Sequence, residues 1–204
     1  MLVQADKGGT IVVIHKDEYA EKINTFLTYS DIHTLQKNPI NKDCKQIHET
    51  LQQNNLIFNK NQIRYLTQKN PTPPTLNDQL KLHKPGIPSW PVINNENAPT
   101  YKVAKKLNDI LKQCLDLDSY YNTINSTCPA NNLSKLKINN NHNMITYDIK
   151  DLYVNIPFDK TIKIAKTQLL QNNDKQKTKQ IITTLKSILE QNYFSYQDTI
   201  YHPK

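Results

Sequence analysis

The sequence has few of the features that mark secreted or membrane proteins. No apolar run approaches the roughly 20 residues that span a bilayer, and the N-terminus lacks the charged-then-apolar layout of a signal peptide. The only three cysteines are Cys44, Cys114 and Cys128, with no Cys-x-x-Cys pair. An odd, scattered set is typical of a reduced intracellular chain rather than a disulfide framework or a zinc site. The composition therefore predicts an intracellular protein with no membrane partner.

Arginine is nearly absent, since Arg64 is the only one among 26 basic residues, whereas Asn occurs 25 times. Lys, Asn and Ile have A/T-rich codons, so this bias indicates genome base composition more than function. The net charge of +8 is uneven, because residues 101–204 carry 15 basic and 9 acidic side chains. A basic half favours an anionic partner, because phosphate contacts release counterions. An ordinary solvated surface would give the same composition.

The pattern of apolar residues predicts a mixed α/β chain of one domain or two small ones, without repeats. Strands are predicted at 10–14, where the strand should be buried, at 144–149, and in a hairpin at 193–202. Prolines favour an extended or edge segment at 80–93, and they indicate a break near 71–79. The polar stretch 119–143 is a second candidate boundary. Helices are predicted at 16–27, 43–51, 60–68, 99–115, 157–170 and 174–191.

The most informative segment is TYDIKDLYVNIP, residues 146–157. An Asp at the end of an apolar strand can hold a divalent cation, and the next backbone carbonyl can add a second hard oxygen ligand. Asp148 and the carbonyl of Ile149 are therefore candidate ligands for Mg²⁺ or Mn²⁺. Polymerases use two such ions to activate the attacking hydroxyl and neutralise the leaving phosphate. Tyr153 could stack under an incoming sugar, although a surface Asp and a core Tyr produce the same short pattern.

Four segments follow one another along nearly the whole chain: ADKGGTIVVI at 5–14, KLHKPGIPSWPVINNENAPTYKVAKKL at 81–107, YDIKDLYVNIP at 147–157 and NYFSYQDTIYHP at 192–203. In order, they resemble the D-K-G block, the K-x-H-K-P-G block, polymerase motif A and the hairpin before motif B of one family. This family is the reverse transcriptases of Penelope-like retroelements.

The resemblance implies a right-hand polymerase fold of the α/β (α+β) class. A fingers-like region would occupy 1–143, and the start of the palm, with motif A, would occupy 144–204. The implied activity is that of an RNA-directed DNA polymerase, which adds deoxynucleotides to a primer 3′-OH by two-metal phosphoryl transfer in the full-length enzyme. Its partners would be an RNA template, a DNA primer and deoxynucleoside triphosphates. A nuclear location is implied by the genome-inserting habit of the family, and not by any signal in the sequence.

The resemblance also assigns roles to individual residues. Asp148 falls on the first catalytic aspartate, and Tyr153 falls on the aromatic residue that excludes a ribose 2′-OH. Lys81 falls on a fingers lysine that meets the nucleotide phosphates or the template. Asp151, where the family more often has Ser, is counted with the nucleotide-binding residues. The candidate nucleic-acid-binding residues are the lysines of the first two blocks and of the helix that follows: Lys7, Lys84, Lys102, Lys105 and Lys106.

Two departures from the family pattern bear on activity. Trp90 stands where the family has an Arg whose planar fork would grip a triphosphate, although an indole could instead stack on a base. The sequence ends at Lys204, before motif B and the paired aspartates of motif C, so we expect residues 1–204 alone to lack a complete two-metal site. Two alternatives stay open: a non-catalytic nucleic-acid-binding remnant, in which the basic helix at 99–115 contacts phosphates, and an inactive, pseudogene-like fragment.

Overall fold

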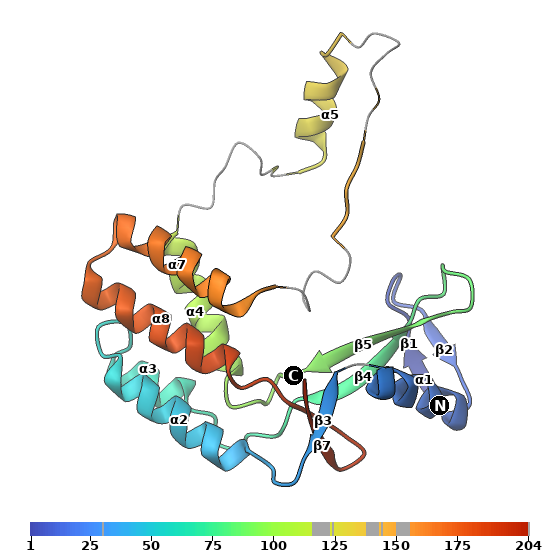
Figure 1. Ribbon diagram of the computed structural model, residues 1–204, viewed down its shortest axis with the longest axis horizontal. Helices are drawn as coiled ribbons and strands as arrows, with labels where there is room; N and C mark the ends of the chain where they lie inside the picture. The colour runs from blue at the N-terminus through green and yellow to red at the C-terminus, as the bar shows by residue number, and fades with distance from the viewer. Residues whose placement is uncertain are drawn as a thin grey trace.

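A five-stranded sheet lies beside a group of packed helices in the computed structural model of the chain (Figure 1). The structure describes residues 1–29, 31–115, 123, 125–137, 143, 145–149 and 156–203. Helices and strands are both present in quantity, so the predicted α+β class is confirmed. The more specific right-hand polymerase fold stays a prediction. Within the described part of the chain, no helix has both the length and the apolar character needed to cross a bilayer.

The five-stranded sheet combines strands from distant parts of the sequence. Its order is β3-β7-β6-β4-β5. The strands are β3 (Ile32–Leu35), β4 (Thr75–Leu80), β5 (Ser89–Asn94), β6 (Phe194–Tyr196) and β7 (Thr199–Pro203). β4 and β5 form an antiparallel hairpin, and β4 runs parallel to β6 where Thr75 lies opposite Ser195. β5 is an edge strand that contains Pro91, as expected for a residue that cannot donate a ladder hydrogen bond.

The C-terminal hairpin was correctly predicted. β6 and β7 pair antiparallel through a two-residue turn, Gln197–Asp198, whose φ angles are +45° and +63°. Two positive φ angles are typical of the hairpin turn whose twist matches that of the flanking strands. β7 also pairs with β3. The sequence did not predict β3 or β4, and β4 occupies part of the segment that prolines had marked as a break.

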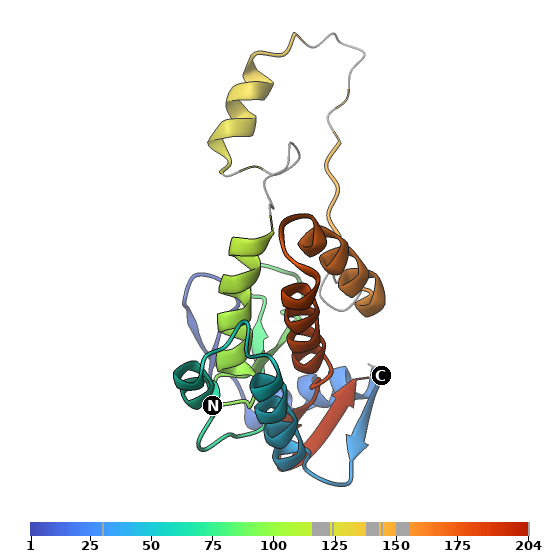
Figure 2. The ribbon, with the colours of Figure 1, turned by 90° about the vertical axis from the view of Figure 1, so that its left-hand side faces the viewer.

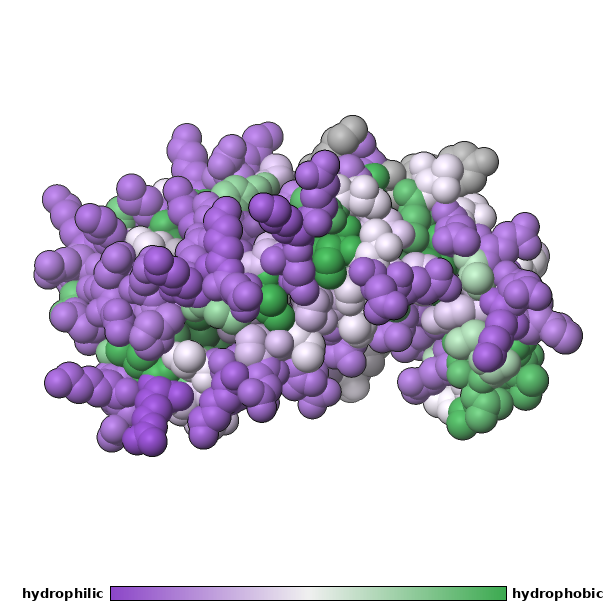
Figure 3. All heavy atoms as spheres, turned by 90° about the horizontal axis from the view of Figure 1, so that it is seen from below, coloured by the Kyte–Doolittle hydropathy of each residue, from purple (hydrophilic) through white to green (hydrophobic). Residues whose placement is uncertain are grey.

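The N-terminal hairpin consists of β1 (Leu2–Gln4) and β2 (Ile11–Val13). The prediction of a strand at 10–14 is confirmed, but its predicted burial is wrong, because Ile11 is 65% and Val13 is 81% exposed. Alternate residues of a strand face opposite sides. Val3 and Val12 of the hairpin pack in a cluster with Ile14, Leu80 and Tyr19. Figure 3 shows apolar side chains grouped at the right-hand end, where this hairpin lies.

Among the described residues, six helices agree closely with the predicted ranges, whereas a helix at Thr127–Ser134 lies in the polar stretch 119–143, where no helix was predicted. The helices are α1 (Lys16–Tyr29), α2 (Ile40–Gln53), α3 (Lys60–Leu66), α4 (Tyr101–Cys114), α5 (Thr127–Ser134), α7 (Phe158–Asn172) and α8 (Lys175–Leu189). Local chemistry explains two of the starts. The Asn59 side chain accepts from the Gln62 N–H and the Gln62 side chain accepts from the Asn59 N–H, which forms a capping box. The Asp174 carboxylate accepts two backbone hydrogen bonds at the start of α8.

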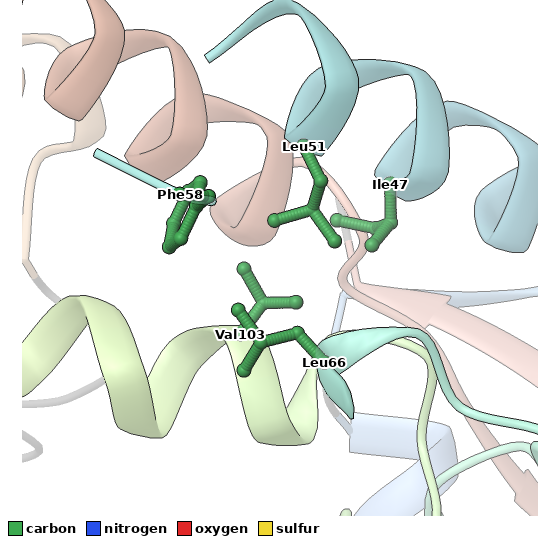
Figure 4. Close-up of a cluster of buried hydrophobic side chains, with 5 residues drawn as sticks. All are labelled: Ile47, Leu51, Phe58, Leu66 and Val103. Atoms are coloured by element: carbon green, nitrogen blue, oxygen red, sulfur yellow. The ribbon is translucent and has the colours of Figure 1, made fainter. Parts of the chain in front are cut away.

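The helical core contains residues from both halves of the chain. One cluster joins α2, α3 and α4 through Ile47, Leu51, Phe58, Leu66 and Val103 (Figure 4). A second cluster joins α4, α7 and α8, and α7 and α8 lie side by side in Figures 1 and 2. Helices from before and after residue 143 therefore share one core. The proposed division into fingers and palm at that residue stays a prediction.

The described residues of the predicted strand at 144–149 do not form a strand. These residues, 145–149, have no regular secondary structure, and Tyr147 is 90% exposed. Alternation of apolar and polar residues makes a strand possible, but a strand also needs a partner to receive its backbone hydrogen bonds. None of the described strands pairs with this segment.

Candidate nucleic-acid and nucleotide interface

Two loops meet at one end of the β4–β5 hairpin (Figure 1). The first connects β1 to β2 at residues 5–10, and the second connects β4 to β5 at residues 81–88. Ala5 forms a parallel bridge with Leu80, and the Asp6 N–H donates to the Leu80 carbonyl over 3.2 Å. Segments that are distant in the sequence, and that carry the first two blocks of the resemblance, are therefore in direct contact.

A side-chain contact also joins the two loops. His83 Nδ1 lies 3.6 Å from Asp6 Oδ1, and the Asp6 side chain is only 11% exposed. That Asp6 oxygen accepts no hydrogen bond from the described residues. The pair becomes an ion pair when His83 is protonated. No pattern in the sequence could pair these two residues, because their contact depends on the docking of one hairpin against the other.

Lys81 lies against the indole that distinguishes this chain from the family. Its Nζ is 3.4 Å from the centroid of the Trp90 ring, a short cation–π contact. Trp90 is opposite Gln79 in the hairpin and is 42% exposed. The contact holds the Lys81 ammonium at the hairpin surface and leaves part of the indole open to solvent. An anionic group that approached Lys81 would therefore also reach the aromatic ring.

The other predicted lysines of the two loops are exposed. Lys7 lies in the first loop and Lys84 in the second. A further lysine, Lys22 of α1, donates to the Ile87 carbonyl over 3.2 Å and ties the second loop to that helix. Ile87 has a φ of +44°, which is strained for a β-branched residue. Strain of this kind persists where surrounding contacts hold the backbone, and it is more frequent at binding sites than elsewhere.

The lysines of α4 lie in a different place. α4 packs against α8 and against the cluster of Figure 4, away from the paired loops (Figure 1). Lys102 is half-buried and lies over the Tyr65 ring, with its Nζ 5.1 Å from the ring centroid, whereas Lys105 is exposed and Lys106 is partly exposed. The predicted set of nucleic-acid-binding lysines is thus divided between two regions of the surface.

Asp148 and Ile149 lie in the exposed segment 145–149. Asp151 and Tyr153 lie outside the described residues. Across the part of the chain that is described, no three His, Cys, Asp or Glu side chains come together in a way that could hold a metal ion. A single exposed carboxylate does not form a two-metal site. The binding of Mg²⁺ or Mn²⁺ by a complete active site stays a prediction.

A buried carboxylate lies beneath the Lys81–Trp90 surface. Asp78 is 2% exposed, its Oδ1 accepts a hydrogen bond from the Ser89 hydroxyl, and its N–H donates to the Tyr19 hydroxyl over 2.9 Å. Asp78 Oδ2 has no partner among the described residues. Burial raises the pKa of this carboxyl, although the Ser89 hydrogen bond opposes the shift.

This raised pKa predicts a pH dependence of stability. A carboxyl with a higher pKa in the folded state contributes stability below its ordinary pKa of 3.8, and that contribution is lost as the pH rises through the folded value. Between about pH 4 and pH 7, the wild type should therefore lose stability relative to Asp78→Asn. Urea unfolding of both proteins across this range measures the difference. Parallel pH profiles would contradict the assignment to Asp78.

The chain was compared with known proteins at the level of families, sequences and structures. No family model, no curated protein and no solved structure matches it.

Proposed function

We propose that residues 1–204 form the fingers and the first part of the palm of an RNA-directed DNA polymerase of the Penelope-like kind. In this proposal, the two paired loops bind the phosphates of an RNA template, a DNA primer or an incoming deoxynucleotide. Polymerisation itself belongs to the full-length enzyme, to which Asp148 would contribute one carboxylate.

The observation that carries the proposal is the meeting of the two N-terminal blocks. Residues 5–14 and 81–93 match separate blocks of the family pattern. The Asp6–His83 pair joins the two blocks, and Ala5 and Asp6 also pair with Leu80, the residue directly before the second block. Blocks that form one site are expected to come together in space, whereas chance matches have no reason to do so. The contact therefore supports a shared function for the two blocks.

The charges of the paired loops suit a phosphate ligand. Lys7, Lys81 and Lys84 lie on the two loops, and Asp6 is the only acidic residue among positions 5–10 and 81–88. Asp6 is mostly covered and lies beside His83, so the exposed charge of the loops is positive. Lysines in such an arrangement bind phosphate as point charges, with an affinity that falls as salt rises.

A non-catalytic nucleic-acid-binding role is the second candidate. Two observations favour it: Trp90 replaces the family's Arg and already engages Lys81, and Asp148 is exposed without a second carboxylate among the described residues. Primer extension by the full-length enzyme on an RNA template, with deoxynucleotides and Mg²⁺ or Mn²⁺, separates the two roles. Extension that is abolished by Asp148→Ala identifies the polymerase. Binding that survives Asp148→Ala, with no extension by the wild type, identifies the non-catalytic binder.

Binding of a labelled RNA-template/DNA-primer duplex, measured by fluorescence anisotropy at several salt concentrations, tests the paired loops directly. Each of Lys81→Ala and Lys84→Ala should weaken binding about fivefold and reduce the salt slope by about one, because each removes one phosphate contact. Lys163→Ala, an exposed lysine of α7, is the matched control and should change binding by less than about twofold.

Equal losses of duplex affinity in the three lysine variants would mean that binding depends only on net charge. That result would contradict a binding site at the loops. Failure of the wild type to bind the duplex at low salt would contradict both candidate functions. The effect of Trp90→Arg distinguishes them further, because restoring the family's residue should tighten nucleotide binding only if the loops form a nucleotide site.

A further inference from the structure

A polar groove of about 570 Å³ lies between the end of α3, the loop that follows it and the start of α4. Its lining includes three basic side chains, Arg64, Lys69 and Lys102, together with the ring of Tyr65. The remaining lining residues are Thr, Asn or Gln, so no acidic side chain lines the groove. The chain's single arginine therefore lies at a basic groove.

The groove lies directly beside the helical core. Leu66 and Val103 are buried in the cluster of Figure 4, and the residues directly before them, Tyr65 and Lys102, form part of the groove surface. Lys102 Nζ donates to the Tyr65 carbonyl over 3.3 Å and lies 5.1 Å from the centroid of its ring. The helix packing thus fixes both groups relative to each other.

No acidic side chain of the described residues forms an ion pair with the basic residues of the groove. Among the described residues there are two contacts of the ion-pair type, Lys45–Glu49 and Asp6–His83, and neither involves the groove. Arg64 and Lys69 are exposed, and Lys102 is held by a carbonyl and an aromatic ring. An arrangement of three unneutralised cations attracts an anionic ligand with more than one charge.

The aromatic ring narrows the choice of ligand. Tyr65 is 70% exposed, so its ring is open to a planar partner although Lys102 approaches it. Sequence-tolerant binding of single strands combines cations that follow the backbone with aromatic rings on which bases stack. The amide side chains of Gln68 and Asn97 add donors and acceptors that suit base edges. A free phosphate ion would use the cations but not the ring.

We propose that this groove binds single-stranded nucleic acid, with phosphates on Arg64, Lys69 and Lys102 and one base stacked on Tyr65. The site lies on α3 and α4, apart from the paired loops. It does not depend on the polymerase assignment, because it requires neither Asp148 nor Lys81. It also separates Lys102 from Lys105, which lies on the same helix but does not line the groove.

The test is equilibrium binding of a fluorescent oligo-uridylate of about 12 nucleotides, measured by anisotropy with the full chain. Tyr65→Leu should weaken binding about tenfold without changing the salt slope, because it removes stacking but no charge. Tyr65→Phe should bind like the wild type. Arg64→Ala and Lys102→Ala should each weaken binding about fivefold and lower the salt slope by about one, whereas Lys105→Ala should change binding by less than about twofold.

Thermal melting of each variant confirms that the changes leave the fold intact, as expected for side chains on the surface. Equal losses of affinity in Lys102→Ala and Lys105→Ala, with no loss in Tyr65→Leu, would overturn the proposed binding site. Binding would then reflect only a general attraction to a basic surface. Binding of the template–primer duplex without binding of the single strand would also overturn it, while the proposed function would stand. An acidic peptide that displaces the oligonucleotide with higher affinity would reassign the groove to a protein partner.

Cross-linking with 4-thiouridine gives the position of the bound strand. Cross-links should map to the peptides that contain Tyr65 and Lys102, and their yield at subsaturating protein should fall in Arg64→Ala in line with its weaker binding. Cross-links confined to residues 81–94 would place the strand on the paired loops and would contradict the proposal.

Discussion

Phe58→Ala is expected to lower the free energy of unfolding by about 3–5 kcal/mol. Phe58 is 1% exposed and packs in the cluster that contains Leu51 of α2 and Val103 of α4 (Figure 4). Its removal leaves a cavity that the surrounding helices can fill only in part, so the loss of packing adds to the lost transfer energy. Urea denaturation at constant pH measures the change.

Leu56→Ala is the matched control, because this large apolar residue lies two positions away and is 55% exposed. It should cost less than about 1 kcal/mol. Comparable costs for the two substitutions would mean that Phe58 is not packed between the helices. The result also bears on function, since the same cluster holds α3 against α4 and so determines the shape of the groove beside Tyr65.

Thr184→Val is expected to cost about 1–3 kcal/mol, because it removes the acceptor of a buried hydrogen bond. Asn54 Nδ2 donates to Thr184 Oγ1 over 2.8 Å, and the two residues are 4% and 0% exposed. Valine keeps the volume of threonine but leaves the Asn54 amide without its acceptor. A second buried hydrogen bond joins α2 to α8, between the Thr50 and Ser187 hydroxyls, whose oxygens are 3.0 Å apart.

Thr183→Val is the control for this second substitution. The Thr183 hydroxyl donates to a backbone carbonyl four residues earlier, as the Thr184 hydroxyl does, but Thr183 is exposed. We expect it to change stability by less than about 0.5 kcal/mol. A double-mutant cycle with Asn54→Ala should give a coupling energy for the Asn54–Thr184 pair, and additivity would contradict the hydrogen bond.

These polar contacts matter because of what they join. α2 precedes the segment that resembles motif A, and α8 follows it. The Asn54–Thr184 and Thr50–Ser187 bonds therefore connect the chain before Asp148 with the chain after it. Weakening them should destabilise the whole helical core rather than a single helix, so both halves should unfold in one transition.

Helices were predictable because their signals are local. The apolar face of α4 and the Asp174 cap of α8 can be read within a few turns of sequence, and the corresponding ranges agree with the structure. The turn of the β6–β7 hairpin is local as well. Strands were less predictable. β3 obtains its partner, β7, from more than a hundred residues later in the chain, and β4 pairs with the distant β6 as well as with the neighbouring β5.

The same distinction explains the errors. The alternating segment at 144–149 has strand-like composition, but its described residues find no partner, whereas the strand at 10–14 finds one and still leaves half of its side chains in solvent. Strand formation depends on which other segment pairs with the strand, and burial depends on which segment packs over it. Local periodicity contains no information on that choice.

The sequence by itself determined the helices, the turns, the excess of positive charge and the identity of the candidate residues, since each of these depends on neighbours along the chain. Only the tertiary structure decided which residues act together. It brought Asp6 to His83, placed Lys81 against Trp90, separated Lys102 from Lys105, and gathered Arg64, Tyr65 and Lys102 around one groove. The physical reason is that a binding site requires proximity in space, and the packing of distant apolar faces creates that proximity.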